Sequence, residues 1–389
     1  MEIQLKYGCN PHQDFAWLVY EGKHCPLRVI NGRPGYINFL DAFGAWRVAR
    51  ELKIATGRSG AASFKHVSPA GAAVAKPIDE DLRRSQMLPE EELSPVATAY
   101  VRARAGDRLS SFGDVVAVSD IVDVSLANVL RREVSDLIIA PGYEDEALEM
   151  LQQKKGGKYI ILEMDPNYDP PEIERRDVYG FQLEQTRNKA LVNRDMLSDV
   201  VSKDRAVPEE AAVTLPVATV ALKYTQSNSV ALGYDGQVIG IGAGQQSRVH
   251  CTRLACRKAD KWFLQQHPKV LDLKFKEGLK RVEKTNLVDQ YLLWDELSDH
   301  EREALMGQFE QAPSPLTREE RLEWIGNYDG VGMSSDAFFP FRDNIDRASR
   351  SAVQYILQPG GSVRDEDVTR AADEYGMVMI HSGVRWFLH

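Results

Sequence analysis

Short apolar runs alternate with helical patterns along most of the chain. Residues 114–120, 137–140 and 159–162 are apolar and rich in β-branched side chains, which is typical of buried strands. The segments 126–132 and 144–155 lie between these runs and carry apolar residues at the spacing of amphipathic helices. Strands that alternate with helices predict an α/β fold with a layered α/β/α sheet.

A second sheet is predicted beyond a break in this pattern. The break is the proline- and charge-rich stretch 164–176, MDPNYDPPEIERR. The strands expected after it are 217–222 (VATVAL), 237–241 (QVIGI), 377–380 and 386–388. Residues 258 to about 323 are mostly helical and polar. Two packed units also suit a length of 389 residues.

Composition narrows the class of protein. Hydrophobic residues make up 43% and charged residues 27% of the chain, and no apolar stretch approaches the ~18 residues of a membrane span. The N-terminus lacks a signal-peptide core. The four cysteines (Cys9, Cys25, Cys251 and Cys256) are too few for a disulfide framework. The composition predicts a reduced, cytoplasmic protein. A net charge of −9 argues against a general nucleic-acid binder.

Lys65 and His66 are the first candidate catalytic groups. An imidazole, with an ordinary pKa near ~6.5, accepts a proton at neutral pH. An adjacent ammonium stabilises an oxyanion. Phe64 and Val67 flank the pair, and we expect the run from Ser68 onward (SPAG) to turn the chain after a strand. The alternative is a surface lysine beside a turn histidine.

A glycine run and a nearby arginine are the second candidate. Gly240, Gly242 and Gly244 follow a predicted strand and precede a helical stretch, where glycines let backbone amides approach an anion. A tight turn without a ligand is the alternative. The spacing is G-x-G-x-G, which does not match the dinucleotide fingerprint of an oxidoreductase. The planar fork of Arg248 suits a carboxylate or carboxamide.

Two further groups of residues are ambiguous when taken alone. His250, Cys251 and Cys256 give only three soft ligands and no C-x-x-C pair, so we expect core thiols and no zinc. The run SSDAFFPFRDN (334–344) sets three phenylalanines between two aspartates. It suits either a pocket for a flat heterocycle or a core segment. Asn228, which we place after a strand, offers a donor and an acceptor.

Eight runs, in their order along the chain, carry a resemblance to a known family. They are KYGCNPHQ, SFKHVSPAG, SSFGD, REVSD, IIAPGYE, KYTQSNSV, GQVIGIGAGQQSR and SSDAFFPFRDN. Together they resemble the transformylase part of the bifunctional purine-biosynthesis enzymes, 5-aminoimidazole-4-carboxamide ribonucleotide (AICAR) formyltransferase. The runs span essentially the whole chain, which starts almost at the first of them. We therefore expect a stand-alone transformylase, with IMP cyclohydrolase on a separate protein.

The resemblance implies a one-carbon transfer in purine (IMP) biosynthesis. The formyl group of 10-formyltetrahydrofolate would pass to the 5-amino group of AICAR, giving FAICAR and tetrahydrofolate. By motif match His66 would be the general base and Lys65 the oxyanion partner that protonates the leaving nitrogen. Asn228 would orient the nucleotide or the formyl group. A nucleotide-binding protein without catalysis is the alternative, although it would be expected to have lost Lys65 or His66.

The resemblance also implies two sets of binding residues. Those for AICAR are Lys6, Tyr7, His66, Gly113, Asp136, Asn228, Phe338 and Arg385, with Lys155 a further candidate near the phosphate. Those for folate are Arg248, Val249, Asp343, Ser362 and Val363. Asp136 would bind ribose hydroxyls, and Arg385 with Lys6 the 5′-phosphate. The family commonly has arginine where this chain has Lys6, so the bidentate fork is lost and we expect the phosphate to be bound more weakly there or in a different arrangement.

The fold implied by the resemblance has two cytidine-deaminase-like three-layer α/β/α units that exchange segments. The first unit would comprise residues 1–174 plus about 266–326, and the second about 175–265 plus 327–389. The family also implies a homodimer with sites at its interface. A monovalent-cation site, with potassium in a structural role, is implied near Thr225, Ser229 and Asp336.

Overall fold

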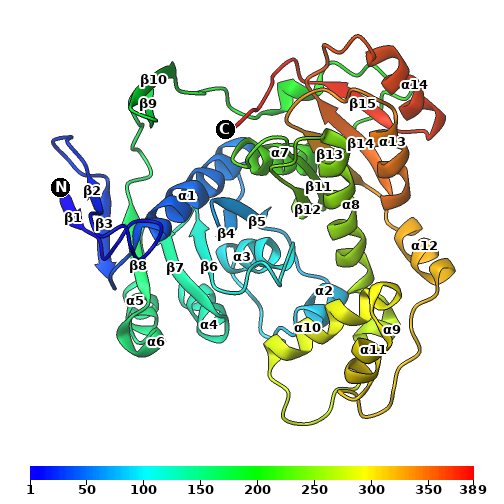
Figure 1. The fold of residues 1–389 in the computed structure, drawn as a ribbon, viewed down its shortest axis with the longest axis horizontal. Helices are drawn as coiled ribbons and strands as arrows, with labels where there is room; N and C mark the ends of the chain where they lie inside the picture. The colour runs from blue at the N-terminus through cyan, green and yellow to red at the C-terminus, as the bar shows by residue number, and fades with distance from the viewer.

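The computed structural model describes residues 1–389 and is built around one mixed sheet of eleven strands (Figure 1). The strand order is β15-β14-β13-β11-β12-β5-β4-β6-β7-β8-β3. These strands are β3 (Leu27–Asn31), β4 (Gly60–Lys65), β5 (Ser68–Val74), β6 (Asp114–Val118), β7 (Ser135–Ala140), β8 (Ile160–Met164), β11 (Val230–Tyr234), β12 (Gln237–Gly242), β13 (Val331–Ser335), β14 (Val353–Gln358) and β15 (Val378–His381).

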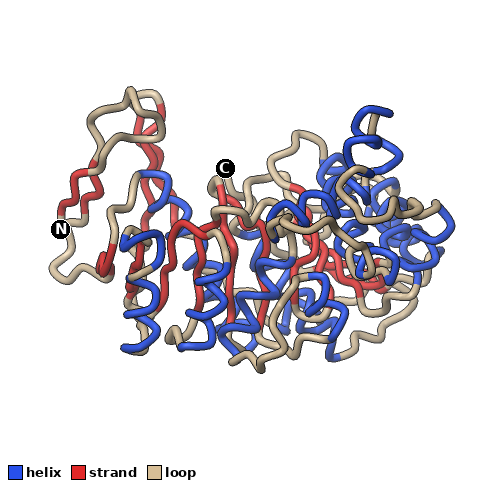
Figure 2. The backbone as a smooth tube through the Cα atoms, turned by 90° about the horizontal axis from the view of Figure 1, so that it is seen from below, coloured by secondary structure: helices blue, strands red, loops and turns tan.

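Two small hairpins lie outside the large sheet. They pair β1 (Glu2–Gln4) with β2 (Trp17–Val19), and β9 (Ile173–Val178) with β10 (Phe181–Thr186). Every residue of β9 and β10 is exposed, and this hairpin projects from the body of the molecule in Figures 1 and 2.

Fourteen α-helices and three short 3-10 helices connect the strands. The α-helices are α1 (Tyr36–Thr56), α2 (Glu80–Ser85), α3 (Pro95–Ala105), α4 (Val124–Arg132), α5 (Asp145–Gln152), α6 (Lys154–Gly157), α7 (Glu209–Lys223), α8 (Arg248–Leu264), α9 (Pro268–Leu271), α10 (Arg281–Leu292), α11 (Asp299–Met306), α12 (Arg318–Gly326), α13 (Asp343–Ala348) and α14 (Asp365–Glu374). The 3-10 helices are η1 (Arg194–Leu197), η2 (Trp294–Glu296) and η3 (Ser349–Ser351).

The helices cover the sheet in layers, and the predicted α/β class is confirmed. Helix α1 packs on β4 to β7 and against α7, and the two helices share one apolar core with the sheet. Helices α3, α4 and α5 form a second core on the other side of β4 to β8, and α8 with its neighbouring helices forms a third against β11 to β15. None of the helices is both long and apolar enough to cross a membrane.

The expected second sheet is continuous with the first. Strands β3 to β8 and strands β11 to β15 form two halves, joined by the pairing of Gln237 in β12 with Ala73 in β5. The segment α9 to α12 packs mainly in the core of the second half, and it also reaches the first half through ion pairs such as Arg281–Glu133. The unit boundaries near 174, 265 and 326 stay predictions.

The predicted strand at 217–222 is wrong, because these residues belong to helix α7. The helix starts after Pro208, carries Glu209 and Glu210 in its first turn and is buried on all sides from Val213 to Lys223. A helix that is apolar all round is buried between layers, and its short apolar run has the same composition as a buried strand. The spacing of apolar residues therefore could not distinguish a buried helix from a buried strand here.

Two local expectations are also wrong. Residues 68–71 do not turn the chain but begin strand β5, which pairs with β4 as a hairpin. Residues 386–388 form no strand. Their backbone instead bonds to another part of the chain: the N–H of Trp386 donates to the carbonyl of Asp336, and the carbonyl of Leu388 accepts from Ser227. Trp386 is buried by this docking, which explains its apolar character.

Candidate active site

Most of the predicted site residues lie along one edge of the large sheet, meaning here the side on which the ends of neighbouring strands line up. The end of β4 pairs with the starts of β5 and β6, and β7 runs parallel to β6. Across the second half, the same edge carries the start of β11 and the ends of β12, β13, β14 and β15. The predicted residues that follow or precede these strand ends are Lys65, His66, Gly113, Asp136, Asn228, Arg248, Val249, Phe338, Asp343, Ser362, Val363 and Arg385.

Lys65 and His66 occupy the tip of the β4–β5 hairpin. His66 and Val67 both have positive φ (54° and 58°), so the turn displays the imidazole at the sheet edge. The Lys65 ammonium donates to the carbonyl of Phe112 at 2.5 Å, and no carboxylate forms an ion pair with it. The hairpin therefore holds a cation and an imidazole side by side at an exposed position.

Gly113 and Asp136 lie together beside this hairpin. Gly113 has φ +75°, and a Cβ added to it would lie 3.7 Å from a carboxylate oxygen of Asp136. Asp136 forms an ion pair with Lys155 at 2.5 Å. The structure thus brings four predicted residues, Lys65 with His66 and Gly113 with Asp136, to neighbouring strand ends, together with the candidate Lys155. We call these five residues the hairpin cluster.

Asp41 on α1 was missed by the sequence analysis. Its carboxylate accepts a hydrogen bond from the backbone N–H of Val67 at 2.6 Å, so it holds the turn that displays His66. Asp41 is 5% exposed, and burial raises the pKa of its carboxyl above the ordinary 3.8, although the hydrogen bonds from the turn oppose that shift. The available signal was a carboxylate on the apolar face formed by Phe39, Ala42 and Ala45.

Replacing Asp41 with asparagine is expected to change how stability depends on pH. A carboxyl whose pKa is raised by folding binds protons more tightly in the folded state, so its stabilising contribution falls as pH rises through the window above 3.8. The amide of the Asp41→Asn variant would keep an oxygen for the N–H of Val67 without this loss. Urea unfolding at a series of pH values from acid to neutral should show the variant gaining stability relative to the wild type as pH rises. If the stabilities of the variant and the wild type changed in parallel with pH, the raised pKa of Asp41 would be contradicted.

Arg248 is the centre of a second, buried group of polar residues. One guanidinium nitrogen contacts Asp336 at 2.5 Å and Ser335 at 2.9 Å, and the other donates to the side-chain oxygen of Asn228 at 2.6 Å. The Asn228 amide in turn donates to the carbonyls of Gln245 and Gln246. Arg248 is 7% and Asp336 0% exposed. We call Asn228, Arg248 and Asp336 the arginine cluster.

Two features of the arginine cluster differ from the sequence-based picture. Asn228 follows helix α7, not a strand. The guanidinium of Arg248, predicted to bind folate, is engaged by protein groups. The other carboxylate oxygen of Asp336 accepts from Ser227 and from the N–H of Ser229, while the hydroxyl of Thr225 donates to a helix carbonyl. These groups lie close together, and the monovalent cation stays a prediction.

The C-terminal segment runs beside this cluster. Its backbone bonds to Asp336 and Ser227 place Arg385 nearby, with the guanidinium 4.5 Å from the centre of the Phe387 ring and exposed to solvent. An exposed guanidinium without a carboxylate partner is available to an anion.

Two adjacent loops carry Phe338, which belongs to the predicted AICAR set, and three of the predicted folate residues. Phe338 is 41% exposed after β13, and Asp343 starts α13. Ser362 and Val363 lie in the loop after β14, where Val363 is fully exposed. Phe341 and Arg364 link the two loops, because the guanidinium of Arg364 lies 5.7 Å from the Phe341 ring.

Lys6 and Tyr7 lie apart from these clusters. They occupy the loop between β1 and β2, next to the β3 end of the sheet in Figure 1, and the Lys6 ammonium lies 5.6 Å from the Tyr7 ring. No hydrogen bond or ion pair joins them to the hairpin cluster.

The glycine run serves packing between β12 and α8. A Cβ at Gly240 would lie 2.2 Å from the carbonyl oxygen of Ala255, and a Cβ at Gly242 would lie 2.1 Å from that of Cys251. Only glycine allows the strand and the helix to approach so closely. Cys251 and Cys256 are fully buried, as expected of core thiols, and no group of three or more His, Cys, Asp or Glu side chains is arranged to hold a metal ion.

Replacing Gly242 with alanine is expected to destabilise the fold by about 1–3 kcal/mol or more, because the new methyl group overlaps backbone of α8. Gly326 is a matched control, since it ends helix α12 and has open space around its Cβ position. Chemical denaturation should show a loss for Gly242→Ala and no loss for Gly326→Ala. If the two variants were equally stable, the close contact between Gly242 and α8 would not be important for the stability of the fold.

Comparison with known protein families matches residues 1–258 to the AICARFT/IMPCHase bienzyme family. The chain belongs to this family. It is 31% identical over 392 residues to the bifunctional purine biosynthesis protein PurH of Roseobacter denitrificans, covering 99% of this chain and 59% of the relative. It is 30% identical over 390 residues to PurH of Mesorhizobium japonicum, with 99% and 58% covered.

The family assignment confirms the resemblance found in the sequence at the level of the family. The chain spans about three fifths of the length of the PurH relatives that it matches. The matched region of the AICARFT/IMPCHase family includes the hairpin cluster as well as Asn228 and Arg248.

Proposed function

We propose that this protein transfers the formyl group of 10-formyltetrahydrofolate to the 5-amino group of AICAR. The observation that carries the proposal is the β4–β5 hairpin, which presents Lys65 and His66 at the sheet edge beside Gly113 and Asp136. A surface lysine beside a turn histidine would not need the buried carboxylate of Asp41 to hold the turn. Membership of a family named for this transformylase supports the same reaction.

The two side chains have complementary roles in the proposed reaction. The 5-amino group of AICAR is a weak nucleophile, so His66 accepts a proton from it as the nitrogen bonds to the formyl carbon. The Lys65 ammonium stabilises the oxyanion of the tetrahedral intermediate. The bond from the formyl carbon to N10 of the folate then breaks, and N10 takes a proton from Lys65. Transfer of the proton from His66 to Lys65 restores both groups.

The spacing of the clusters supports a site shared between two copies of the chain. His66, in the turn that follows β4, and Asn228, before β11, are separated by β5 and β12, which is about 14 Å at the usual distance between strands when counted from β4. Asp136 on β7 and Phe338 after β13 are about 29 Å apart by the same estimate. The second separation is too large for a single AICAR molecule to contact both Asp136 and Phe338 of one chain. A homodimer that sets the hairpin cluster of one copy against the arginine cluster of the other would complete the site.

A turnover assay tests the proposed reaction. Purified protein is mixed with AICAR and 10-formyltetrahydrofolate, and tetrahydrofolate is followed by absorbance while FAICAR is measured by mass spectrometry. We expect both products in equal amounts and only when AICAR is present. Lys65→Met is the matched control, because it keeps the aliphatic stem of the side chain and removes the ammonium. Binding of AICAR without turnover would instead favour a nucleotide-binding protein that lacks catalysis.

A further inference from the structure

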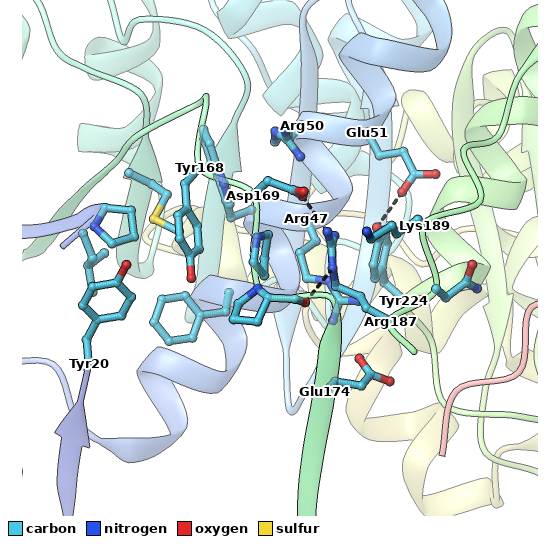
Figure 3. A pocket seen from close by; sticks show the side chains of 18 of the residues that line it. Tyr20, Arg47, Arg50, Glu51, Tyr168, Asp169, Glu174, Arg187, Lys189 and Tyr224 are labelled. Carbon is cyan, nitrogen blue, oxygen red and sulfur yellow. Dashed lines mark hydrogen bonds and ion pairs between the residues drawn. The ribbon is translucent and has the colours of Figure 1, made fainter. Parts of the chain in front are cut away.

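A cavity of about 660 Å³ lies between helix α1 and the segment that runs from Met164 to Leu191 (Figure 3). None of its lining residues belongs to the predicted AICAR or folate sets. Its volume is within the range of pockets that bind small molecules. Fourteen of its 26 lining residues are hydrophobic, so it also has the mixed lining of such pockets.

Two arginines of α1 face this cavity without a carboxylate partner. Arg47 and Arg50 are three residues apart, which places them on one side of the helix. The Arg47 guanidinium lies 4.5 Å from the ring centre of Tyr224 and forms no ion pair with a carboxylate. Arg50 donates only its Nε hydrogen, to the carbonyl of Pro166 at 3.0 Å. Both guanidinium groups therefore keep free N–H donors toward the cavity.

The other lysine and arginine side chains around the cavity are paired with carboxylates. Lys223 is 5% exposed and contacts Glu51 at 2.8 Å. Arg187 pairs with Asp169 at 2.6 Å, and Lys189 pairs with Glu172 at 3.2 Å. Among the side chains, Arg47 and Arg50 are thus the cations of the cavity without a carboxylate partner, and the N-terminal ammonium of Met1 donates to the carbonyl of Tyr20. An anion bound there would accept hydrogen bonds from two guanidinium groups.

Aromatic side chains also line the cavity. Tyr20 and Tyr168 lie at one end of the pocket, whereas Glu51 and Tyr224 lie at the other (Figure 3). The rings of Tyr20 and Tyr168 are 6.2 Å apart and nearly perpendicular. Phe43 and Trp46 add further aromatic surface from α1. Such a lining suits a flat apolar body more than a hydrated sugar.

We propose that this cavity binds a planar aromatic carboxylate. Its ring system would lie among Tyr20, Tyr168 and Trp46, and its carboxylate would accept hydrogen bonds from Arg47 and Arg50. The inference rests on the cavity itself and is independent of the proposed formyl transfer. A segment of a second copy of the chain is the competing occupant.

The test compares two probes of the same shape by isothermal titration calorimetry with the full chain. 2-Naphthoate carries the carboxylate, and 2-naphthamide replaces it with a neutral group. We expect 2-naphthoate to bind once per chain and roughly tenfold or more tightly than 2-naphthamide, because only the anion gains charge-assisted hydrogen bonds. Arg47→Ala and Arg47→Ala/Arg50→Ala should abolish this preference. Arg131→Ala, an exposed arginine of α4 outside the cavity, should keep it.

Several outcomes would overturn the proposal. Equal binding of the two probes, absence of binding, or an unchanged preference in the Arg47→Ala variant would each exclude Arg47 as the anion partner. Binding that weakens as the protein concentration rises and the chains associate would assign the cavity to a second copy. Arg47 forms no ion pair within the protein, so its single variant remains informative even if the double variant unfolds.

Discussion

Replacing His66 with asparagine is expected to lower kcat for formyl transfer by about 10²–10⁴-fold, the usual contribution of a general base. Asparagine is the informative substitution because it tolerates the positive φ of 54° at this position, where alanine would add backbone strain. The amide has no basic nitrogen. The dissociation constant for AICAR should stay nearly unchanged, because the remaining nucleotide residues are intact. Steady-state kinetics and equilibrium binding of AICAR measure the two effects separately.

A histidine away from the site provides the control for this substitution. His300 is exposed on α11 and its side chain makes no hydrogen bond, so His300→Ala should retain full activity. Full turnover by the His66→Asn variant would exclude His66 as the general base. A large loss of AICAR affinity with little change in kcat would make His66 a binding residue only.

Replacing Asp336 with alanine is expected to lower the free energy of unfolding by about 3–5 kcal/mol, because it leaves the buried guanidinium of Arg248 without its counter-ion. The same change removes the acceptor for the Ser227 hydroxyl and the Ser229 N–H. Asn228 would lose its fixed partner as Arg248 moves, so kcat should fall as well. Urea denaturation followed by circular dichroism measures the stability.

Two variants make the Asp336 result interpretable. Glu296→Ala breaks the Arg257–Glu296 pair, in which both side chains are more than half exposed, and should cost less than about 1 kcal/mol. Arg248→Met/Asp336→Ala removes both charges and should be less destabilised than Asp336→Ala alone. If Asp336→Ala were no more destabilising than Glu296→Ala, the arginine cluster would not be a buried ion pair in solution.

The sequence predicted the elements whose pattern is local and unambiguous. Apolar spacing placed several elements correctly, namely helix α4 and strands β6, β7, β8 and β15. The change from strand to helix before Arg248 also appears where the sequence predicted it. The stretch 217–222 failed because a fully buried helix has no polar face to reveal its period. The docked segment at Trp386 failed because its apolar residue is buried by contacts with residues distant in the sequence.

The residues of the candidate site could be singled out from the sequence, whereas their arrangement in space could not. Lys65, His66, Gly113 and Asp136 were singled out from sequence runs, and the strand register now places them at one sheet edge. That Asp41 would hold the turn from helix α1 depends on how the helix packs, which spacing along the chain does not reveal. The engagement of Arg248 by Asp336 likewise depends on the pairing of β11 with β12 and β13.

We propose that formyl transfer takes place at a site built from the hairpin cluster of one chain and the arginine cluster of another. The decisive experiment mixes two variants expected to be inactive, His66→Asn and Asn228→Ala, and allows their subunits to exchange. Random pairing gives mixed dimers with one intact site each, so activity should recover to about a quarter of the wild-type value. If mass spectrometry shows mixed dimers while activity stays at the level of the separate variants, the shared site is contradicted.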